Sequence, residues 1–234
     1  MATDIRVATA STRKDCEAAG ALFDRVWGMS GMVPNEVIIA TVHAGGYASL
    51  AKLGDDIVGA SWGFLGSHGG EHTLHSHVTG VIARHGSAGV GEALKRHQWA
   101  WAKARQLDSI TWSFDPLVRR NAYFNLVKLG AQVIEYHEDF YGSIEDGLNR
   151  GEHTDRLIVR WAVDGRSETS TGATINHAAW TIATPEDVEA LRLVDRSVAH
   201  GWRTRQRADL RKVFSGGWKI AGLMSDGSYA VVRA

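Results

Sequence analysis

Residues 82–106 read IARHGSAGVGEALKRHQWAWAKARQ, in which Gly86, Gly89 and Gly91 directly precede a helical pattern. The stretch before them, HTLHSHVTGVIA, has the composition of a strand. In a strand–turn–helix unit, the first N–H groups of the helix have no intrahelical acceptor, and the helix dipole adds positive potential there. The segment therefore predicts an anion site, typically for phosphate or pyrophosphate, at the start of the helix.

The spacing of the glycines narrows the kind of phosphate site. A dinucleotide-binding fingerprint requires G-x-G-x-x-G, and a nucleoside-triphosphate loop ends in G-K-[ST]. Gly86, Gly89 and Gly91 give G-x-x-G-x-G. The two commonest nucleotide loops are therefore excluded.

The rest of the chain alternates between strand and helix patterns. Strands are expected at 5–8, on both sides of a turn at 54–56, and at 72–83, 109–114, 132–136, 157–163 and 180–183. Helices are expected at 15–27, from Pro34, from 90 to 104 and from 117 to 129, with Gly130 as the stop. This alternation predicts an α/β (α+β layered) fold with a central mixed twisted sheet flanked by helices.

The polar segment 164–174 is typical of a linker, and it separates a first domain, 1–163, from residues 175–234. In this last part Thr184 is expected to cap a helix with Pro185 at its first position, broken near Gly201, and a hairpin follows to the end of the chain. So short a segment scarcely buries a core alone. We therefore expect a small C-terminal α/β appendage packed on the first domain.

The helix at 90–104 is amphipathic. Val90, Leu94, His97, Trp101 and Ala104 fall on one face, and the opposite face carries Glu92, Lys95, Trp99 and Lys103. Lys95 is therefore expected at the polar surface.

Charge and cysteine content restrict the setting in which the protein works. The 26 basic and 26 acidic side chains balance, so neither nucleic acid nor an anionic membrane is an expected partner. The single cysteine excludes an internal disulfide, and no signal peptide or membrane-spanning stretch is evident. A cytoplasmic protein is expected.

The glycine segment resembles the acetyl-CoA-binding loop of the GNAT (Gcn5-related N-acetyltransferase) superfamily. Gly89-Val90-Gly91 matches the second half of that loop, whereas Gly86 stands where the family has Arg or Gln, and Arg84 lies two residues earlier. The order of elements over 1–163 and the stretch NAYFNLVKLGA are also similar to the family. LHSHVTGV and TWSFDPLVRRNAYFNLVKLGA look closest to a poorly characterised bacterial subgroup with a similar C-terminal extension.

The resemblance implies an N-acyltransferase that uses acetyl-CoA or another acyl-CoA, without a metal, to acylate a small amine or amino acid by direct attack on the thioester. Pantetheine would run between the strands at 75–82 and 109–114, and a backbone N–H near residues 78–80 would hold the thioester oxygen. A monomer or homodimer is expected. The implied cofactor-binding residues are Val81, Ile82, Ser87, Ala88, Gly89, Val90, Gly91, Asn121 and Phe124.

Candidates for proton transfer and acceptor recognition are His75, His77, Asp115 and Tyr123. His75 and His77 are two apart on a strand and so share a face, and an imidazole pKa near neutrality suits a base. Some family members place a carboxylate base near the position of His75. Asp115 could recognise an amine or cap the turn before Pro116.

The family's proton-donating tyrosine, counted back from Gly130, falls on Leu126, and Tyr123 or Tyr141 could substitute for it. Arg119, Arg120 and Asn121 could contact a carboxylate or a CoA phosphate, or form a solvated helix start.

Two alternative functions stay open. Because the tyrosine position is a leucine, the protein could bind acyl-CoA without catalysis. His68, His72, His75 and His77 could instead build a metal-dependent hydrolase, although no cysteine and no H-E-x-x-H order accompanies them.

Overall fold

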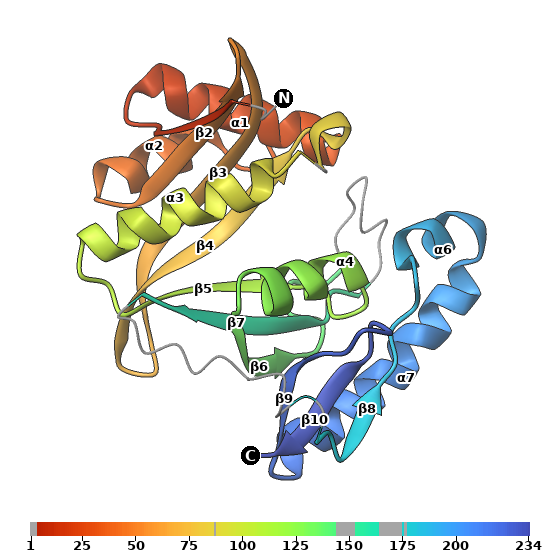
Figure 1. Ribbon diagram of the computed structural model, residues 1–234. Coiled ribbons are helices and arrows are strands. Elements are labelled where there is room, and N and C mark those ends of the chain that lie inside the picture. Colours follow the sequence, from red (N-terminus) through yellow and green to blue (C-terminus); the bar gives the residue numbers. More distant parts are fainter. Residues whose placement is uncertain (1–3, 87, 144–152, 164–174, 176) are drawn as a thin grey trace. The chain divides into compact units, whose positions relative to one another are not determined.

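Figure 1 shows the computed structural model, which describes residues 4–86, 88–143, 153–163, 175 and 177–234. The strands are β1 (Ile5–Thr9), β2 (Tyr47–Leu53), β3 (Asp56–His68), β4 (Glu71–Val81), β5 (Ser109–Phe114), β6 (Gln132–His137), β7 (Arg156–Ala162), β8 (Trp180–Ile182), β9 (Trp218–Leu223) and β10 (Tyr229–Arg233). The helices are α1 (Arg13–Trp27), α2 (Asn35–His43), α3 (Val90–Ala104), α4 (Arg119–Ala122), α6 (Val188–Val194) and α7 (Arg196–Ser215).

Seven strands are hydrogen-bonded in the order β1-β2-β3-β4-β5-β7-β6, and three more form a sheet in the order β8-β10-β9. Neighbours from β1 to β4 are antiparallel, β4 and β5 are parallel, and β6 and β7 are antiparallel. The predicted mixed sheet with flanking helices is therefore confirmed, as are the additional strands near the C-terminus.

The chain divides into two compact units, each described here by itself. The first comprises Met1–Thr111 with Ala162–Gly165, and the second comprises Trp112–Trp161 with Arg166–Ala234. The division passes through β5, whereas the sequence suggested a boundary at 164–174, a segment outside the described residues. Residues 112–161 share a unit with the C-terminal segment because β6 contacts both β9 and α7.

In the first unit, helices cover both faces of the sheet. α1 and α2 pack over one face, where Phe23 and Ile38 bury completely beside Trp62 and Val78. α3 covers the other face through Val90 and Leu94. Alternation along the strands supplies apolar side chains to both layers.

The start of the helical region in the second unit differs from expectation. Asp187 caps α6, because its carboxylate accepts from the Ala190 N–H. Thr184 is no cap, since its hydroxyl accepts from Arg119 and donates to the Gly227 carbonyl. The predicted start at Thr184 and Pro185 was wrong because a tertiary contact holds the capping side chain.

The break between the last two helices was also misplaced. It lies at Asp195, whose side chain caps α7 by accepting from the Val198 N–H, while Gly201 lies inside α7. A side chain that satisfies a free N–H sets the break here, and a glycine inside a helix is tolerated at a modest cost.

A buried carboxylate joins the C-terminal helices to the rest of the second unit. Asp115 accepts from Arg203 at 2.8 and 2.7 Å and from Arg192 at 2.7 Å, and it also accepts from the Leu117 N–H at 2.9 Å. Burial raises the pKa of Asp115, but the charges of Arg203 and Arg192 outweigh burial and hold it well below the usual range.

Other polar contacts join the same two parts of the second unit. Arg207 donates to both Asp155 oxygens, at 3.0 and 2.6 Å, and the Tyr229 hydroxyl donates to the Pro116 carbonyl at 2.8 Å. β9 and α7 both lie against β6. Residues 177–234 therefore pack on 112–161.

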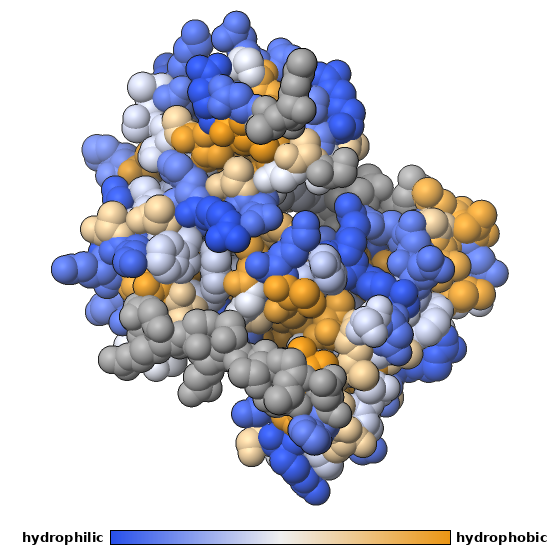
Figure 2. All heavy atoms as spheres, in the orientation of Figure 1, coloured by the Kyte–Doolittle hydropathy of each residue, from blue (hydrophilic) through white to orange (hydrophobic). Residues whose placement is uncertain are grey.

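The corner between α6 and α7 exposes apolar side chains. Leu193 and Val194 are 64% and 82% exposed, and Val198 is partly exposed beside them, as the hydrophobic patch at the right of Figure 2 shows. None of the helices among the described residues is long and apolar enough to cross a membrane.

We expect Asp115→Asn to lower the free energy of unfolding of the second unit by about 3–5 kcal/mol, because two buried guanidinium groups would face a neutral amide. Urea titration with a probe in this unit measures the loss. The matched control is Glu189→Gln, which removes the exposed pair with Arg120 and should cost less than about 1 kcal/mol. Equal losses in both variants would contradict a structural role for the Asp115 cluster.

Candidate functional site

Strand β4 pairs with β5 and carries a bulge within the first unit. Its parallel pairing with β5 joins Thr73–His75 to Ser109–Thr111. Its antiparallel register with β3 shifts, because Gly63 opposes Ser76 while Trp62 opposes Val78, so that His77 is an inserted bulge residue. The bulge lies two residues after His75, the last β4 residue whose pairing with β5 falls within the first unit.

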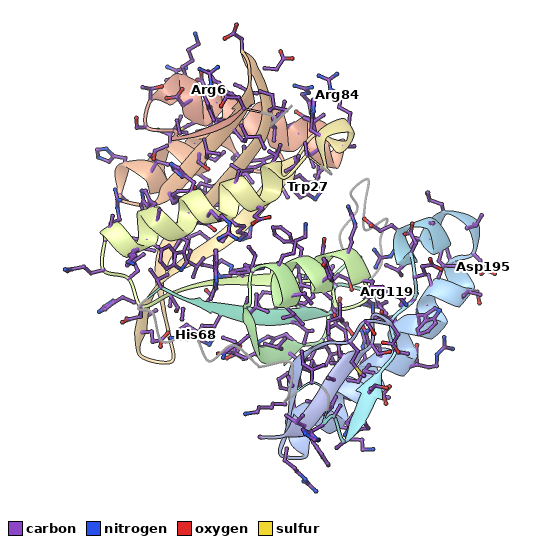
Figure 3. All side chains as sticks on the ribbon, in the orientation of Figure 1. Arg6, Trp27, His68, Arg84, Arg119 and Asp195 are labelled. Carbon is purple, nitrogen blue, oxygen red and sulfur yellow. The ribbon has the colours of Figure 1, made fainter. Side chains whose placement is uncertain are left out.

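A glycine-containing turn follows β4. Ala83–His85 form one 3-10 turn, and Arg84, labelled in Figure 3, donates to the His85 ring at 2.9 Å. Gly89 is the N-cap residue of α3 with φ 82°, a left-handed conformation that glycine adopts without strain. Gly86 has φ −58°, which suits any residue.

No side chain caps the start of α3 among the described residues. The first helical hydrogen bond runs from the Ala93 N–H to the Gly89 carbonyl, so the N–H groups of Val90, Gly91 and Glu92 have no acceptor within the helix. A β-carbon on Gly89 would meet no atom within 4 Å, so the space beside the turn is open. The free N–H groups that the sequence predicted at this helix start are therefore present, and Ser87 lies outside the described residues.

Close packing holds this turn against the sheet. A β-carbon on Gly59 would come within 2.8 Å of Val90, and one on Gly80 within 2.8 Å of Trp27, labelled in Figure 3. Among the predicted cofactor residues, Val81 and Ala88 pack with α3, while Ile82 packs on the α1 side. Their side chains are therefore partly buried in the core on either face of the sheet.

His75 and His77 lie on one face of β4, with ring centroids 6.0 Å apart, as predicted. Phe64 packs against both, with its ring 5.2 Å from His75 and 5.9 Å from His77. The His75 Nδ1 lies 3.3 Å from the Thr111 hydroxyl. Burial, helped by His77, Lys95 and His68, lowers the His75 pKa to about 4, whereas the sequence suggested a value near 6.5.

The expectation that Lys95 of α3 lies at the polar surface is wrong. Its side chain is buried between α3 and the sheet, with only 4% of the residue exposed. Its Nζ donates to Ser76 Oγ at 2.7 Å and to Gln98 Oε1 at 3.3 Å. Burial lowers its pKa to about 7. The helical pattern did not reveal the burial of Lys95, because Lys95 lies directly beside the apolar stripe of the helix. The small hydroxyl residues at Ser49, Ser61 and Ser76 of the facing strands were the available signal.

Trp99 is partly buried and donates to the Ala162 carbonyl at 3.0 Å, with Lys103 over its ring. Ala162, the last residue of β7, therefore helps to bury the Trp99 side chain.

Asp115, Asn121, Tyr123 and Phe124 belong to the second unit. Both oxygens of Asp115 accept from arginines, and one also accepts from the Leu117 N–H, so this carboxylate is a structural centre and caps the turn at Pro116. Arg119 binds Thr184, and Arg120 binds Glu189. These arginines therefore hold the C-terminal segment.

Tyr123 is 48% exposed and begins a π-helical segment, Tyr123–Lys128. The Leu129 N–H donates to the Phe124 carbonyl, five residues back. A π-turn changes which residues share a helix face, so counting back from Gly130 by α-helical spacing does not fix Leu126 as the position of the family's tyrosine. Tyr141, the other candidate, lies with its hydroxyl 3.2 Å from the Ser113 hydroxyl.

The histidines of the metal-site hypothesis do not form a cluster. No group of three or more His, Cys, Asp or Glu residues that could hold a metal ion occurs in the part of the chain that the structure describes. The hydrolase hypothesis therefore gains no support from the geometry.

No known protein family and no curated protein matches the sequence. Many solved structures share the fold. Naa50 of Arabidopsis thaliana, in complex with the bisubstrate analogue CoA-Ac-MVNAL, is 18% identical with a TM-score of 0.54, over 67% of this chain and 97% of that one. The ribosomal-protein-S18-alanine N-acetyltransferase of Escherichia coli is 13% identical with a TM-score of 0.53, over 68% and 94%. YncA of Salmonella typhimurium, a putative acetyltransferase with acetyl-CoA, is 15% identical with a TM-score of 0.53, over 70% and 97%.

The chain has the fold of the GNAT acetyltransferases, as the sequence predicted. These matches span 67–70% of the chain, and the remainder agrees with a C-terminal extension.

We expect the His75 imidazole to stay neutral until the pH falls to about 4, because burial disfavours its cation. NMR titration of the imidazole signals, assigned with a His75→Gln variant, measures this value. A titration midpoint near 6.5 would show that the ring is solvated.

The buried Lys95 makes stability depend on pH. Its folded pKa of about 7 lies below the reference value of 10.5, so the unfolded chain binds more protons between these values and stability rises with pH. From pH 7.0 to 8.5 the gain attributable to Lys95 is on the order of 1–2 kcal/mol. Urea unfolding of wild type and Lys95→Met at both pH values isolates it, and an identical pH dependence of the two proteins would contradict the burial.

Proposed function

We propose that this protein is an acyl-CoA-dependent N-acyltransferase that transfers an acetyl or related acyl group to a small amine or amino acid. The observation that carries the proposal is the glycine turn at the uncapped start of α3, which follows strand β4 with its bulge at His77. The fold is that of proteins whose solved structures contain acetyl-CoA or a CoA analogue.

The chemistry of CoA fits these two features. Its pyrophosphate is an anion, and the N–H groups of Val90 and Gly91 at the start of α3 suit its oxygens. The amide groups of pantetheine can exchange hydrogen bonds with an unpaired strand edge, as a neighbouring strand would. In this proposal the backbone of β4 after His75 takes that role. The acyl-CoA is a cosubstrate here, and the transfer needs no metal.

In the transfer, the amine nitrogen attacks the thioester carbonyl, a C–N bond forms and the C–S bond breaks. Negative charge develops on the carbonyl oxygen, and an N–H near Val78 would stabilise it. His75 would accept the proton that the amine loses. Because its pKa is about 4, it is neutral and able to accept, although the driving force is smaller than for a base near 7. The departing thiolate takes a proton from solvent and leaves as free CoA.

Calorimetry with acetyl-CoA tests the binding step. We expect micromolar affinity for wild type, loss of binding in Gly89→Val, and retained binding in Gly86→Arg. Valine is strained at the left-handed φ of Gly89, whereas the φ of Gly86 suits an ordinary residue. Thermal unfolding of both variants checks that they fold.

Thiol release measured with a panel of amines and amino acids then tests catalysis. Release that depends on the acceptor supports an acyltransferase. Binding without release for any acceptor would favour the non-catalytic alternative, and absence of binding to acetyl-CoA, succinyl-CoA and free CoA would refute both.

A further inference from the structure

The buried Lys95 is costly for the fold and unexplained by packing alone. Its side chain is 4% exposed, and removing an ammonium group from water is unfavourable even when it has hydrogen-bond acceptors. A methionine has a similar length and would carry no such cost. A protein that keeps a charged group where an apolar one suits the core better commonly does so for function.

The contacts of Lys95 place it beside the bulge in β4. Ser76, whose hydroxyl accepts from Nζ at 2.7 Å, is the residue directly before the bulge residue His77. Ser76 is buried, so this contact forms within the packed interface between α3 and the sheet. Lys95 therefore fixes the β4 backbone on the N-terminal side of the bulge.

A second chain of hydrogen bonds leads from Lys95 to the other side of the bulge. Lys95 donates to Gln98 Oε1 at 3.3 Å, and Gln98 Nε2 donates to Ser61 Oγ at 3.3 Å. Ser61 Oγ in turn lies 2.8 Å from Thr79 Oγ1, two residues after His77. One network from α3 thus holds both ends of the bulge, and we call these five residues the α3 clamp: Ser61, Ser76, Thr79, Lys95 and Gln98.

The same helix begins at the glycine turn. Gly89 caps α3, and Lys95 lies less than two turns further along it. A helix is rigid over this length, so the clamp ties the position of the β4 edge to the N–H groups at the start of α3. A ligand that uses both features requires them at a fixed separation.

We propose that Lys95 is a positioning residue for acyl transfer, which through Ser76 and Gln98 holds the β4 bulge so that the backbone N–H groups after His77 face the acyl carbonyl. The inference rests on the proposed function. Lys95 touches neither cosubstrate nor acceptor in this role. Misplacement of such N–H groups by about 1 Å is enough to reduce turnover about a hundredfold.

The test compares Lys95→Met with Lys103→Met, an exposed lysine on the same helix. For Lys95→Met we expect unchanged or higher thermal stability, an acetyl-CoA affinity within about twofold of wild type, and a kcat reduced about ten- to a hundredfold with little change in KM for the amine. Amide hydrogen exchange of residues 76–79 should become at least about tenfold faster. Lys103→Met should match wild type in kcat and in exchange.

Ser76→Ala breaks the same clamp from the strand side without a buried charge being removed. We expect it to lower kcat similarly. The kcat of the double variant with Lys95→Met should be no lower than that of the less active single variant, because both changes remove the same hydrogen bond. If Lys95→Met proves unstable, Ser76→Ala and Gln98→Leu carry the same test.

The outcomes separate this inference from the proposed function. An active wild type together with unchanged kcat and unchanged exchange in Lys95→Met overturns the positioning role alone. A wild type that acylates none of the amines overturns the acyltransferase and the positioning role with it, and exchange at residues 76–79 then shows separately whether the clamp holds the bulge. A fall in affinity for acetyl-CoA that accounts for the whole loss of activity would place the effect of Lys95 in cosubstrate binding and also overturns the inference.

Discussion

The second unit depends on one buried carboxylate. Asp115 lies at the end of β5 and accepts hydrogen bonds from Arg192 and Arg203, which belong to α6 and α7. Taking three charges out of water costs free energy that only good geometry offsets. The arrangement meets this condition, because all three contacts to arginine are 2.7 or 2.8 Å long. It also explains why the C-terminal segment and residues 112–161 form one compact unit.

This use of Asp115 changes the interpretation of its neighbours. Arg119 and Arg120 look like anion-binding residues at a helix start, but their guanidinium groups hold Thr184 and Glu189. Side chains that the sequence offers for acceptor recognition therefore stabilise the C-terminal extension. The features that suit a cosubstrate lie in the first unit, in the backbone of the glycine turn and of β4.

The two buried charges differ in what they do for the fold. Asp115 has guanidinium partners whose charges hold its pKa low, so the folded protein gains from its ionised form. Lys95 lies among hydroxyl and amide groups, and burial lowers its pKa to about 7, so its ammonium form is disfavoured by the fold. The first charge serves stability, while the second reduces it and sits next to the irregular strand that the proposed reaction uses.

The sequence by itself determined the local elements and the glycine turn before α3. Gly89 before an amphipathic helix, the turn at residues 54–56 and the strand patterns depend on backbone conformations and on side-chain periods that neighbouring residues set. These expectations were correct over most of the chain, including the shared face of His75 and His77.

Only the tertiary structure decided which polar groups are buried and which partners they have. Thr184 has the residue type of a helix cap, but Arg119 holds its hydroxyl. Lys95 has the position of a surface residue, but Ser76 on β4 accepts its hydrogen bond inside the core. A pattern along one element cannot specify such pairs, because the free energy of a polar group depends on burial and on partners far away in the chain. The pKa values of His75 and Lys95 were unpredictable for the same reason, since desolvation is a property of the packed structure.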